Sequence, residues 1–296
     1  MVNFSWKVTT KEQGLLLREF LREEKAISKG ALADIKYKGG NIAVNGIETT
    51  VRKKLQAGDT VTIKFPPEQR SPTLLSENID IQIVYEDDYF LVVNKQAGMP
   101  TIPSWMYPSK TLANAVLGYY DQHNIDSTFH AVNRLDKDTS GLVLIAKHRY
   151  AHDLMSTQQK QGHIQRVYFA VVHGKLIQKE FQINAKIGRK DGSIIEREVR
   201  EDGQHALTNV VVRKADKDHS VVEVKLSTGR THQIRVHFSS IGHPLLGDDL
   251  YGGTLEKIQR QALHSWKMRF LHPFTKEEIE LEQHPPQDIQ RAIEQE

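Results

Sequence analysis

The sequence contains no cysteine, and this absence excludes disulfide bonds, thiolate catalysis and cysteine-based zinc sites. No apolar run is long enough to span a bilayer, and no charged segment followed by an apolar one starts at Met1. We therefore expect neither a membrane segment nor a secretory leader and place the protein in the cytoplasm. The fourteen histidines are scattered and form no His-Glu-x-x-His pattern, so we expect no bound metal.

The net positive charge is small, but the basic residues are unevenly placed along the chain. The net charge is +3 over 296 residues, yet residues 1–67 contain twelve Lys or Arg and only seven Asp or Glu, a net of +5. The remainder of the chain is therefore slightly acidic, at about −2. This asymmetry suggests that the N-terminal part attracts phosphate groups, although a solvated charged face is the commoner meaning of such a density.

The N-terminal residues have the pattern of a small α/β unit. Residues 14–25 are amphipathic, and Ser28 is a plausible N-cap for a second helix that stops at Gly39. Asn45-Gly46 between two short apolar runs predicts a hairpin, and residues 60–65 alternate as a further strand. A proline-rich polar stretch follows, so we predict a module over residues 1–66, a semi-rigid linker over 67–78 and a larger domain over 79–296.

The larger domain is rich in predicted strands. Residues 81–85 and 90–94 flank an acidic turn and are typical of a strand pair. Turns that suit antiparallel pairing join most of the remaining segments, so we predict an α+β fold around a mixed, largely antiparallel sheet. The other segments predicted are helices over 111–121 and 148–161 and strands over 168–172, 210–212, 221–226 and 234–237.

The most informative stretch is the polar loop of residues 130–141, which precedes the apolar strand Leu142–Ala146. Its acidic residues and glycine are turn formers, so the loop could serve only to enter the strand. A calcium loop starting at Asp136 is excluded because Lys147 would stand where a bidentate Glu is required. A magnesium-dependent phosphohydrolase using Asp136 and Asp138 lacks an apolar strand ending directly at Asp136, but it stays an alternative.

Arg134-Leu135-Asp136-x-x-Thr139-Ser140-Gly141 resembles the catalytic loop of the RluA-type pseudouridine synthases, which turn uracil about its glycosidic link inside RNA. Further stretches resemble the same family in the same order, and together they cover residues 79–285. Two positions depart from the family's pattern: Asn133 replaces its usual His and Gln96 its usual Pro. The further matching stretches are 80–95, 166–174, 228–237, 242–248 and 262–264.

The resemblance implies three catalytic residues: Asp136, Tyr168 and Arg235. Asp136 would attack carbon or abstract a proton from the sugar, and the sequence does not choose between these routes. Because it must stay ionised in a closed site it needs a fixed cation, which the resemblance identifies as Arg235. Tyr168 would stack on the displaced base. No cofactor is implied, and the residues expected to shape the substrate site are Arg134, Arg230, His232 and Leu263.

The N-terminal unit resembles the S4-like RNA-binding module of ribosomal proteins. We therefore expect RNA as the partner, with large-subunit ribosomal RNA favoured and transfer RNA or a catalytically silent assembly role as alternatives. Trp105 and Tyr107 could meet RNA, but packing onto the core is the commoner role of aromatic residues in such a loop. The basic side chains expected to face phosphates are Lys29, Lys36, Lys38, Arg52, Lys53 and Lys54.

Overall fold

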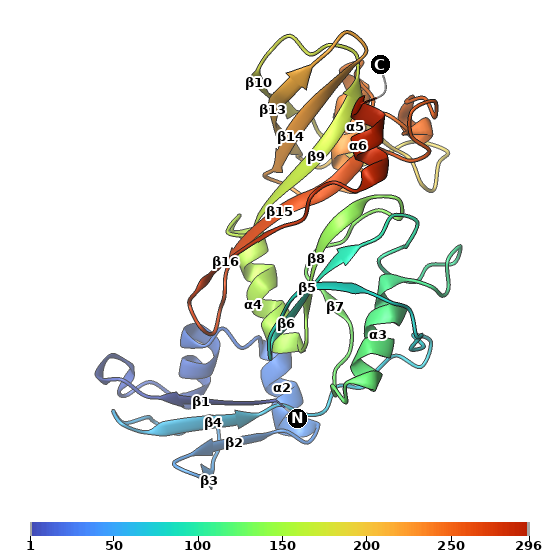
Figure 1. Ribbon diagram of the computed structural model, residues 1–296. Coiled ribbons are helices and arrows are strands. Elements are labelled where there is room, and N and C mark those ends of the chain that lie inside the picture. The colour runs from blue at the N-terminus through green and yellow to red at the C-terminus, as the bar shows by residue number, and fades with distance from the viewer. Residues whose placement is uncertain (1, 295–296) are drawn as a thin grey trace.

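The computed structural model describes residues 2–294, and its N-terminal part is a four-stranded antiparallel sheet covered by helices (Figure 1). The predicted hairpin forms because Asn45 and Gly46 both have positive φ, at 54° and 78°. Ser28 caps the second helix by accepting a hydrogen bond from the Ala31 N–H at 3.2 Å. The strands lie in the order β1-β4-β2-β3 and the elements are β1 (Asn3–Lys7), α1 (Leu17–Glu19) continuing into a π-helical turn (Phe20–Glu24), α2 (Lys29–Tyr37), β2 (Asn41–Val44), β3 (Ile47–Glu48) and β4 (Thr60–Lys64).

A ten-stranded mixed sheet forms the larger part of the molecule, which confirms the predicted α+β fold. Within the described residues its pairs are antiparallel except for β15 beside β8. The path runs β10-β13-β14-β9-β15-β8-β6-β5, with β16 beside β15 and β7 beside β8. Its strands are β5 (Gln82–Glu86), β6 (Phe90–Lys95), β7 (His130–Ala131), β8 (Ser140–Ala146), β9 (Gln165–His173), β10 (Glu180–Asn184), β13 (Leu207–Ala215), β14 (His219–Leu226), β15 (Leu263–Leu271) and β16 (Glu278–Glu282).

Helices and a short ribbon surround this sheet. The predicted helices over 111–121 and 148–161 are confirmed, each beginning one residue after a side-chain N-cap, Thr111 and His148. The elements are α3 (Leu112–Gln122), α4 (Arg149–Lys160), α5 (Gln233–Ser240), α6 (Gln287–Glu294) and the two-stranded ribbon β11 (Ile187–Arg189) with β12 (Arg197–Val199).

Strand β8 lies in the middle of the large sheet, and the polar loop leads directly into it. All seven of its residues are buried, as the uninterrupted apolar run predicts. Gly141 has φ +112°, and a Cβ there would lie 2.3 Å from the Ser265 carbonyl oxygen. Only glycine therefore allows β8 to start this close to β15, which fixes where the preceding loop leaves the sheet.

The prediction of a strand over residues 234–237 is wrong, because these residues belong to α5. Isoleucine and valine alternate there with Arg235 and His237, which imitates the period of two of a half-buried strand. In the structure the apolar and the basic positions are all buried, so the alternation does not distinguish a solvent-exposed face from a buried one. The Gln233 side chain fixes the helix start by accepting hydrogen bonds from the Arg230 N–H at 3.0 Å and from Thr228 Oγ1 at 2.8 Å.

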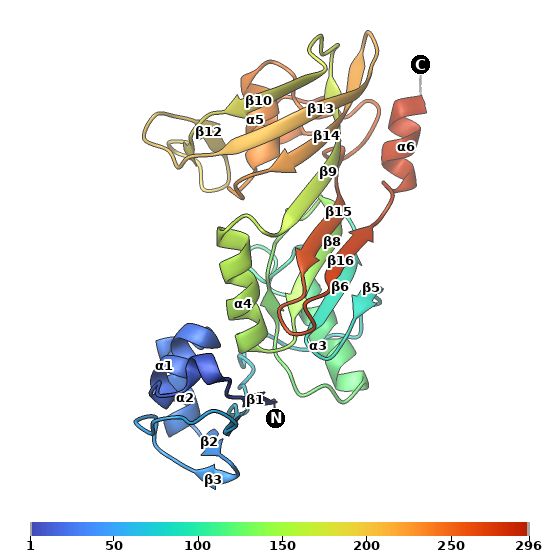
Figure 2. The same ribbon diagram turned by 90° about the vertical axis from the view of Figure 1, so that its left-hand side faces the viewer.

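The N-terminal sheet packs against the large domain through α4 (Figure 2). Tyr150 of α4 enters the N-terminal core, where its ring stacks on Phe65 at 5.4 Å and meets Phe4 edge-on at 5.0 Å. Its hydroxyl donates to the Lys25 carbonyl at 2.5 Å. Burial of several rings in one contact favours a fixed arrangement of the two parts.

The segment predicted as a linker also contacts the large domain. Glu68 accepts a hydrogen bond from the Arg149 N–H at 2.7 Å and contacts the His130 ring. Arg70 donates from Nε to the Ser127 carbonyl at 2.8 Å. The chain between the two parts is therefore held along the surface of the large domain.

Candidate active site

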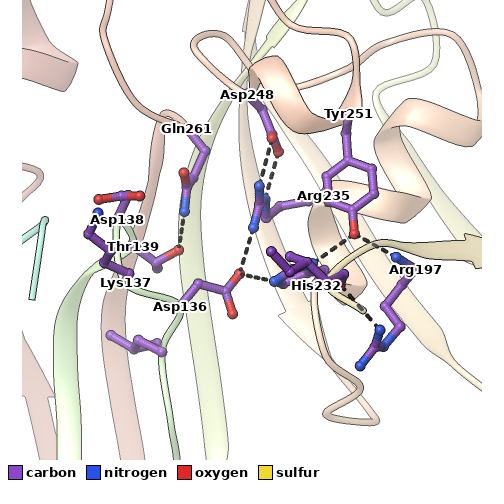
Figure 3. A network of polar contacts seen from close by, with 12 residues as sticks. Asp136, Lys137, Asp138, Thr139, Arg197, His232, Arg235, Asp248, Tyr251 and Gln261 are labelled. Atoms are coloured by element: carbon purple, nitrogen blue, oxygen red, sulfur yellow. Dashed lines mark hydrogen bonds and ion pairs between the residues drawn. The ribbon is translucent and has the colours of Figure 1, made fainter. Parts of the chain in front are cut away.

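Two carboxylates meet one buried guanidinium at the centre of the site (Figure 3). Arg235 of α5 donates from Nε and Nη2 to the two oxygens of Asp248, at 2.7 and 2.8 Å. Its remaining Nη1 donates to Asp136 Oδ2 at 3.2 Å. The predicted pairing of Arg235 with Asp136 is present, but the bidentate partner of the guanidinium is Asp248. The Asp248 side chain is fully buried, whereas that of Asp136 is 28% exposed.

Main-chain hydrogen bonds hold the loop that carries Asp136. Thr101 Oγ1 donates to the Leu135 carbonyl at 2.7 Å, and the buried ammonium of Lys95 donates to the Lys137 carbonyl at 2.9 Å. Asn133 accepts from the Leu144 N–H at 2.8 Å and donates to the Leu142 carbonyl at 3.3 Å. The residue that replaces the family's usual His therefore ties the loop to β8. Hydrogen bonds to the main chain therefore fix the residues immediately before and after Asp136.

His232 joins Asp136 to Tyr251. Its Nε2 lies 3.8 Å from Asp136 Oδ2, and its Nδ1 lies 2.7 Å from the Tyr251 hydroxyl oxygen. That oxygen already accepts the Arg197 N–H at 2.9 Å, so the hydroxyl proton is available for His232 Nδ1. Burial lowers the pKa of His232, which favours a neutral ring with its proton on Nε2, facing Asp136.

The surroundings shift the pKa of three further groups. Burial alone would lower the pKa of Arg235, but its hydrogen bonds to Asp248 and the charge of that carboxylate raise it above its ordinary value. Burial raises the pKa of Tyr168, and the nearby Arg166 charge opposes this. Burial lowers the pKa of Lys95 to about 7, against the opposing charges of Asp136 and Asp138. The site thus combines a permanent cation with a phenol that stays protonated at neutral pH.

The structure brings every residue predicted for the catalytic and substrate site to one cavity. Asp136 and Arg134 come from the loop before β8, Tyr168 from β9, Leu263 from the start of β15 and Arg235 from α5. A larger opening of about 450 Å³ continues from these residues to Arg166 and Ile102. The predicted residues that line the cavity are Arg134, Asp136, Tyr168, Arg230, His232, Arg235 and Leu263.

The basic residues predicted on the N-terminal module do not line a single cavity, unlike the residues predicted for the catalytic and substrate site. Lys36 and Arg52 line one groove of about 490 Å³ together with Tyr37, whose ring is largely exposed. Lys38 pairs with Asp34 at 2.9 Å. Lys29 and Lys54 are exposed, and Lys53 is half-buried.

Three residues of the site were not assigned a role from the sequence: Asp248, Tyr251 and Lys95. Asp248 and Tyr251 lie in the Gly-Asp-Asp-Leu-Tyr-Gly stretch, whose charged and aromatic residues between two glycines were the available signal. Gly247 marks this turn, because its φ is +73° and a Cβ would lie 2.0 Å from the Arg260 carbonyl oxygen. The expectation that Trp105 packs onto the core is wrong, since its side chain is 96% exposed.

The carboxylates of Asp136 and Asp138 do not converge. Asp136 points toward Arg235 and His232, and Asp138 points away from them (Figure 3). Across residues 2–294 no group of three or more His, Cys, Asp or Glu side chains is placed to hold a metal ion. In the same part of the chain no helix is both long and apolar enough to cross a membrane.

This arrangement can present one anionic oxygen to a reacting molecule. Asp136 Oδ2 is held by Arg235, whereas Asp136 Oδ1 has no hydrogen-bond partner among residues 2–294. Tyr168 and Leu263 supply a flat ring and an apolar wall beside it. An ionised carboxylate with a free oxygen in such a cavity suits nucleophilic attack on carbon or proton abstraction.

Comparison with known proteins identifies the family that this chain resembles. Residues 89–240 match the family model described as RNA pseudouridylate synthase. The chain is 49% identical over 270 residues to an uncharacterized RNA pseudouridine synthase, YjbO, of Bacillus subtilis (strain 168), covering 91% of this chain and 95% of that protein. It is 34% identical over 272 residues to ribosomal large subunit pseudouridine synthase D of Xanthomonas campestris, covering 86% and 81%.

Solved structures share the fold of the large domain. Human RNA pseudouridylate synthase domain containing 1 superposes with a TM-score of 0.59 at 27% identity, covering 71% of this chain and 86% of that one. Human RNA pseudouridylate synthase domain containing 4 gives a TM-score of 0.60 at 19% identity, covering 72% and 92%, and shows likeness of fold alone.

We predict that Asp248→Asn destabilises the protein strongly. The amide keeps the shape of the carboxylate but leaves the buried Arg235 without its bidentate counter-charge, which costs roughly 3–5 kcal/mol of the free energy of unfolding. Urea unfolding followed by circular dichroism measures this loss. Asp249→Asn, at the exposed neighbouring position, is the control and should change stability by no more than about 0.5 kcal/mol. Equal stability of the two variants would contradict the shared-guanidinium description.

Proposed function

The chain belongs to the RNA pseudouridylate synthase family, and from this premise we propose that it isomerises specific uridines in large-subunit ribosomal RNA with Asp136 as the reacting group. The ribosomal substrate is supported by relatives at about a third identity that are named ribosomal large subunit pseudouridine synthase D. The basic N-terminal module, proposed over residues 1–66 and joined through residues 67–78 to a catalytic domain over 79–296, supports an RNA substrate of some size.

One observation carries the proposal: in a cavity lined by Tyr168, Asp136 has one oxygen fixed by Arg235 and the other without a hydrogen-bond partner among residues 2–294. Because Arg235 is itself fixed by Asp248, the cation cannot turn away when substrate enters. Arg235 therefore stays beside the Asp136 carboxylate while the base and the cavity walls exclude water.

The reaction breaks the bond between a uracil nitrogen and the ribose carbon, turns the base and joins that ribose carbon to a carbon of uracil. The uracil carbon loses a proton and the freed nitrogen gains one, so there is no net oxidation or reduction. It needs an anionic group at the sugar or base and a closed space in which the detached base stays bound. Asp136 serves as the anion in either route, by attack on carbon or by abstraction of a sugar proton. We propose no cofactor, because each step is a bond exchange or a proton transfer that side chains can perform.

The target nucleotide must leave its stack to reach this cavity, at a cost of a few kcal/mol. We propose that Tyr168 receives the flipped uracil on its ring and that its protonated hydroxyl takes part in proton transfer. Leu263 lines the same cavity, and we propose that Arg134 and Arg230, which also line the larger opening, hold the phosphates on either side of the target nucleotide. His232, whose Nδ1 contacts the Tyr251 hydroxyl, keeps its Nε2 facing Asp136 at 3.8 Å.

We predict that Asp136→Asn abolishes pseudouridine formation while folding and RNA binding persist. The amide is isosteric but can act neither as an anionic nucleophile nor as a base. Large-subunit ribosomal RNA from cells that lack the protein is incubated with purified enzyme, and pseudouridine is mapped before and after. Asp138→Asn, whose side chain points away from the site, is the control and should retain activity. Full activity of folded Asp136→Asn would refute the assignment of Asp136 as the reacting group. Modification of transfer RNA alone would refute large-subunit ribosomal RNA as the substrate.

Substitutions at Tyr168 separate stacking from proton transfer. Tyr168→Phe keeps the ring and should bind RNA nearly normally but turn over slowly, by about 10²-fold or more. Tyr168→Ala removes the ring as well and should lose a further 1–3 kcal/mol or so of binding. Single-turnover rates and filter-binding affinities measure the two effects. Wild-type binding and turnover by Tyr168→Ala would show that the ring only packs the core.

Charge removal in the N-terminal groove tests the RNA-binding module. The double variant Lys36→Gln, Arg52→Gln should bind large-subunit ribosomal RNA more weakly and reduce the slope of log affinity against log salt by roughly 1.5–2, because fewer counterions are released. The matched control Lys175→Gln, Lys217→Gln removes two exposed charges from the segments after β9 and between β13 and β14, which are strands of the other sheet. An identical salt slope for both pairs would contradict a role of this groove.

A further inference from the structure

A solvent-exposed aromatic loop stands beside the active-site opening and has no role in the chemistry described above. Trp105 is 96% and Met106 56% exposed, and Ile102 and Tyr107 are also partly exposed. Large apolar side chains grouped in this way on a surface mark an interaction site.

The loop is built to hold this patch in one conformation. Its two ends are joined by hydrogen bonds from the Leu112 N–H to the Pro100 carbonyl at 2.8 Å and from the Ala113 N–H to the Thr101 carbonyl at 3.1 Å. Its tip is closed by a pair of hydrogen bonds between the main chains of Ser104 and Tyr107, at 2.9 and 3.1 Å. Prolines at 100, 103 and 108 further restrict the backbone. A preformed loop loses little entropy when a partner binds it.

The loop is also fastened to the residues on each side of Asp136. Thr101 Oγ1 donates to the Leu135 carbonyl at 2.7 Å and accepts from its N–H at 3.2 Å. On the other side, Lys137 Nζ lies 3.3 Å from the Tyr107 hydroxyl and 4.8 Å from the centre of its ring. Pro100 and Ile102 line the same opening as Asp136. The patch is therefore continuous with the mouth of the catalytic cavity.

We propose that Trp105 is a stacking platform for an unpaired base of the RNA substrate next to the flipped uridine, a role that rests on the proposed function. Two features favour RNA over a protein partner: the patch continues into the cavity that receives the target nucleotide, and Lys137 provides a cation beside it for a phosphate. An indole ring stacks on any base, so the platform orients the strand at the opening without reading its sequence.

Binding of two RNA probes tests this assignment in the full-length protein. The single-stranded probe is a 12-nucleotide oligouridylate, and the second probe is a blunt duplex of the same length, whose bases are covered by pairing. Trp105→Ala should raise the Kd for the single strand roughly tenfold and leave that for the duplex unchanged. The salt slope should stay at the wild-type value, because no charge is removed. Trp105→Phe should restore most of the affinity.

A spectroscopic control and a matched variant complete the test. Tryptophan fluorescence of the wild type should be quenched by the single strand, and Trp105→Phe, which retains Trp6 and Trp266, should lose that quenching. Ile177→Ala removes an apolar side chain that is 94% exposed elsewhere and should bind both probes as the wild type does. Unchanged affinity of Trp105→Ala for the single strand would overturn the proposal and leave a protein-docking role, and equal losses on both probes would overturn stacking. Because no turnover is measured, either failure is independent of the Asp136→Asn result.

Discussion

The sharing of one buried guanidinium between two carboxylates is the interaction on which the site depends. Arg235 gives two of its donors to Asp248 and one to Asp136. Asp248 is fully buried and Asp136 is partly open to solvent, so the two acidic groups have different surroundings. Asp248 stabilises the cation, and Asp136 keeps one oxygen that has no hydrogen-bond partner among residues 2–294. A single ion pair could not do both, because a buried cation with only a half-exposed partner would be poorly compensated.

Close backbone contacts constrain the chain around the site, and they help to hold Asp136 of the loop before β8 near Arg235 of α5. Gly141 allows β8 to begin against β15, and Gly247 allows the turn before Asp248 to pass the Arg260 backbone. Lys95 and Asn133 then hold the loop before β8 by hydrogen bonds from their side chains to main-chain atoms. The result is a carboxylate whose direction is set by backbone contacts, which is the precision that a reaction within one cavity requires.

Recognition of RNA would use surfaces on two sides of this cavity. The N-terminal groove with Lys36 and Arg52 belongs to a module that is fixed to α4 by Tyr150 and by a cluster of aromatic rings. The Trp105 loop is fixed to the catalytic loop itself. Because both surfaces are fixed to the large domain, an RNA that binds both has to present its target uridine in a defined position relative to them. Such rigidity selects a shape of RNA as much as a sequence.

Much of the fold follows from local rules that the sequence displays openly. The Asn45-Gly46 hairpin, the Ser28 cap and the buried β8 run are set by φ preference, side-chain capping and apolar length, so the sequence predicts them correctly. The largely antiparallel sheet and the family of the chain could be predicted in the same way, from turns that suit antiparallel pairing and from long ordered motifs.

What only the tertiary structure decided depends on partners distant in the chain. Residues 234–237 alternate like a strand but form part of α5, and because both kinds of position are buried, the alternation does not indicate a face that meets solvent. The bidentate partner of Arg235 is Asp248 and the partner of His232 is Tyr251, and neither pairing can be derived from spacing. Trp105 has the apolar character of a core residue, yet the closed loop around it directs the ring into solvent. Sequence by itself predicted residues that the fold gathers at one cavity. Three-dimensional packing decided which charges compensate one another and which ring remains exposed, because burial and pairing are properties of the whole fold.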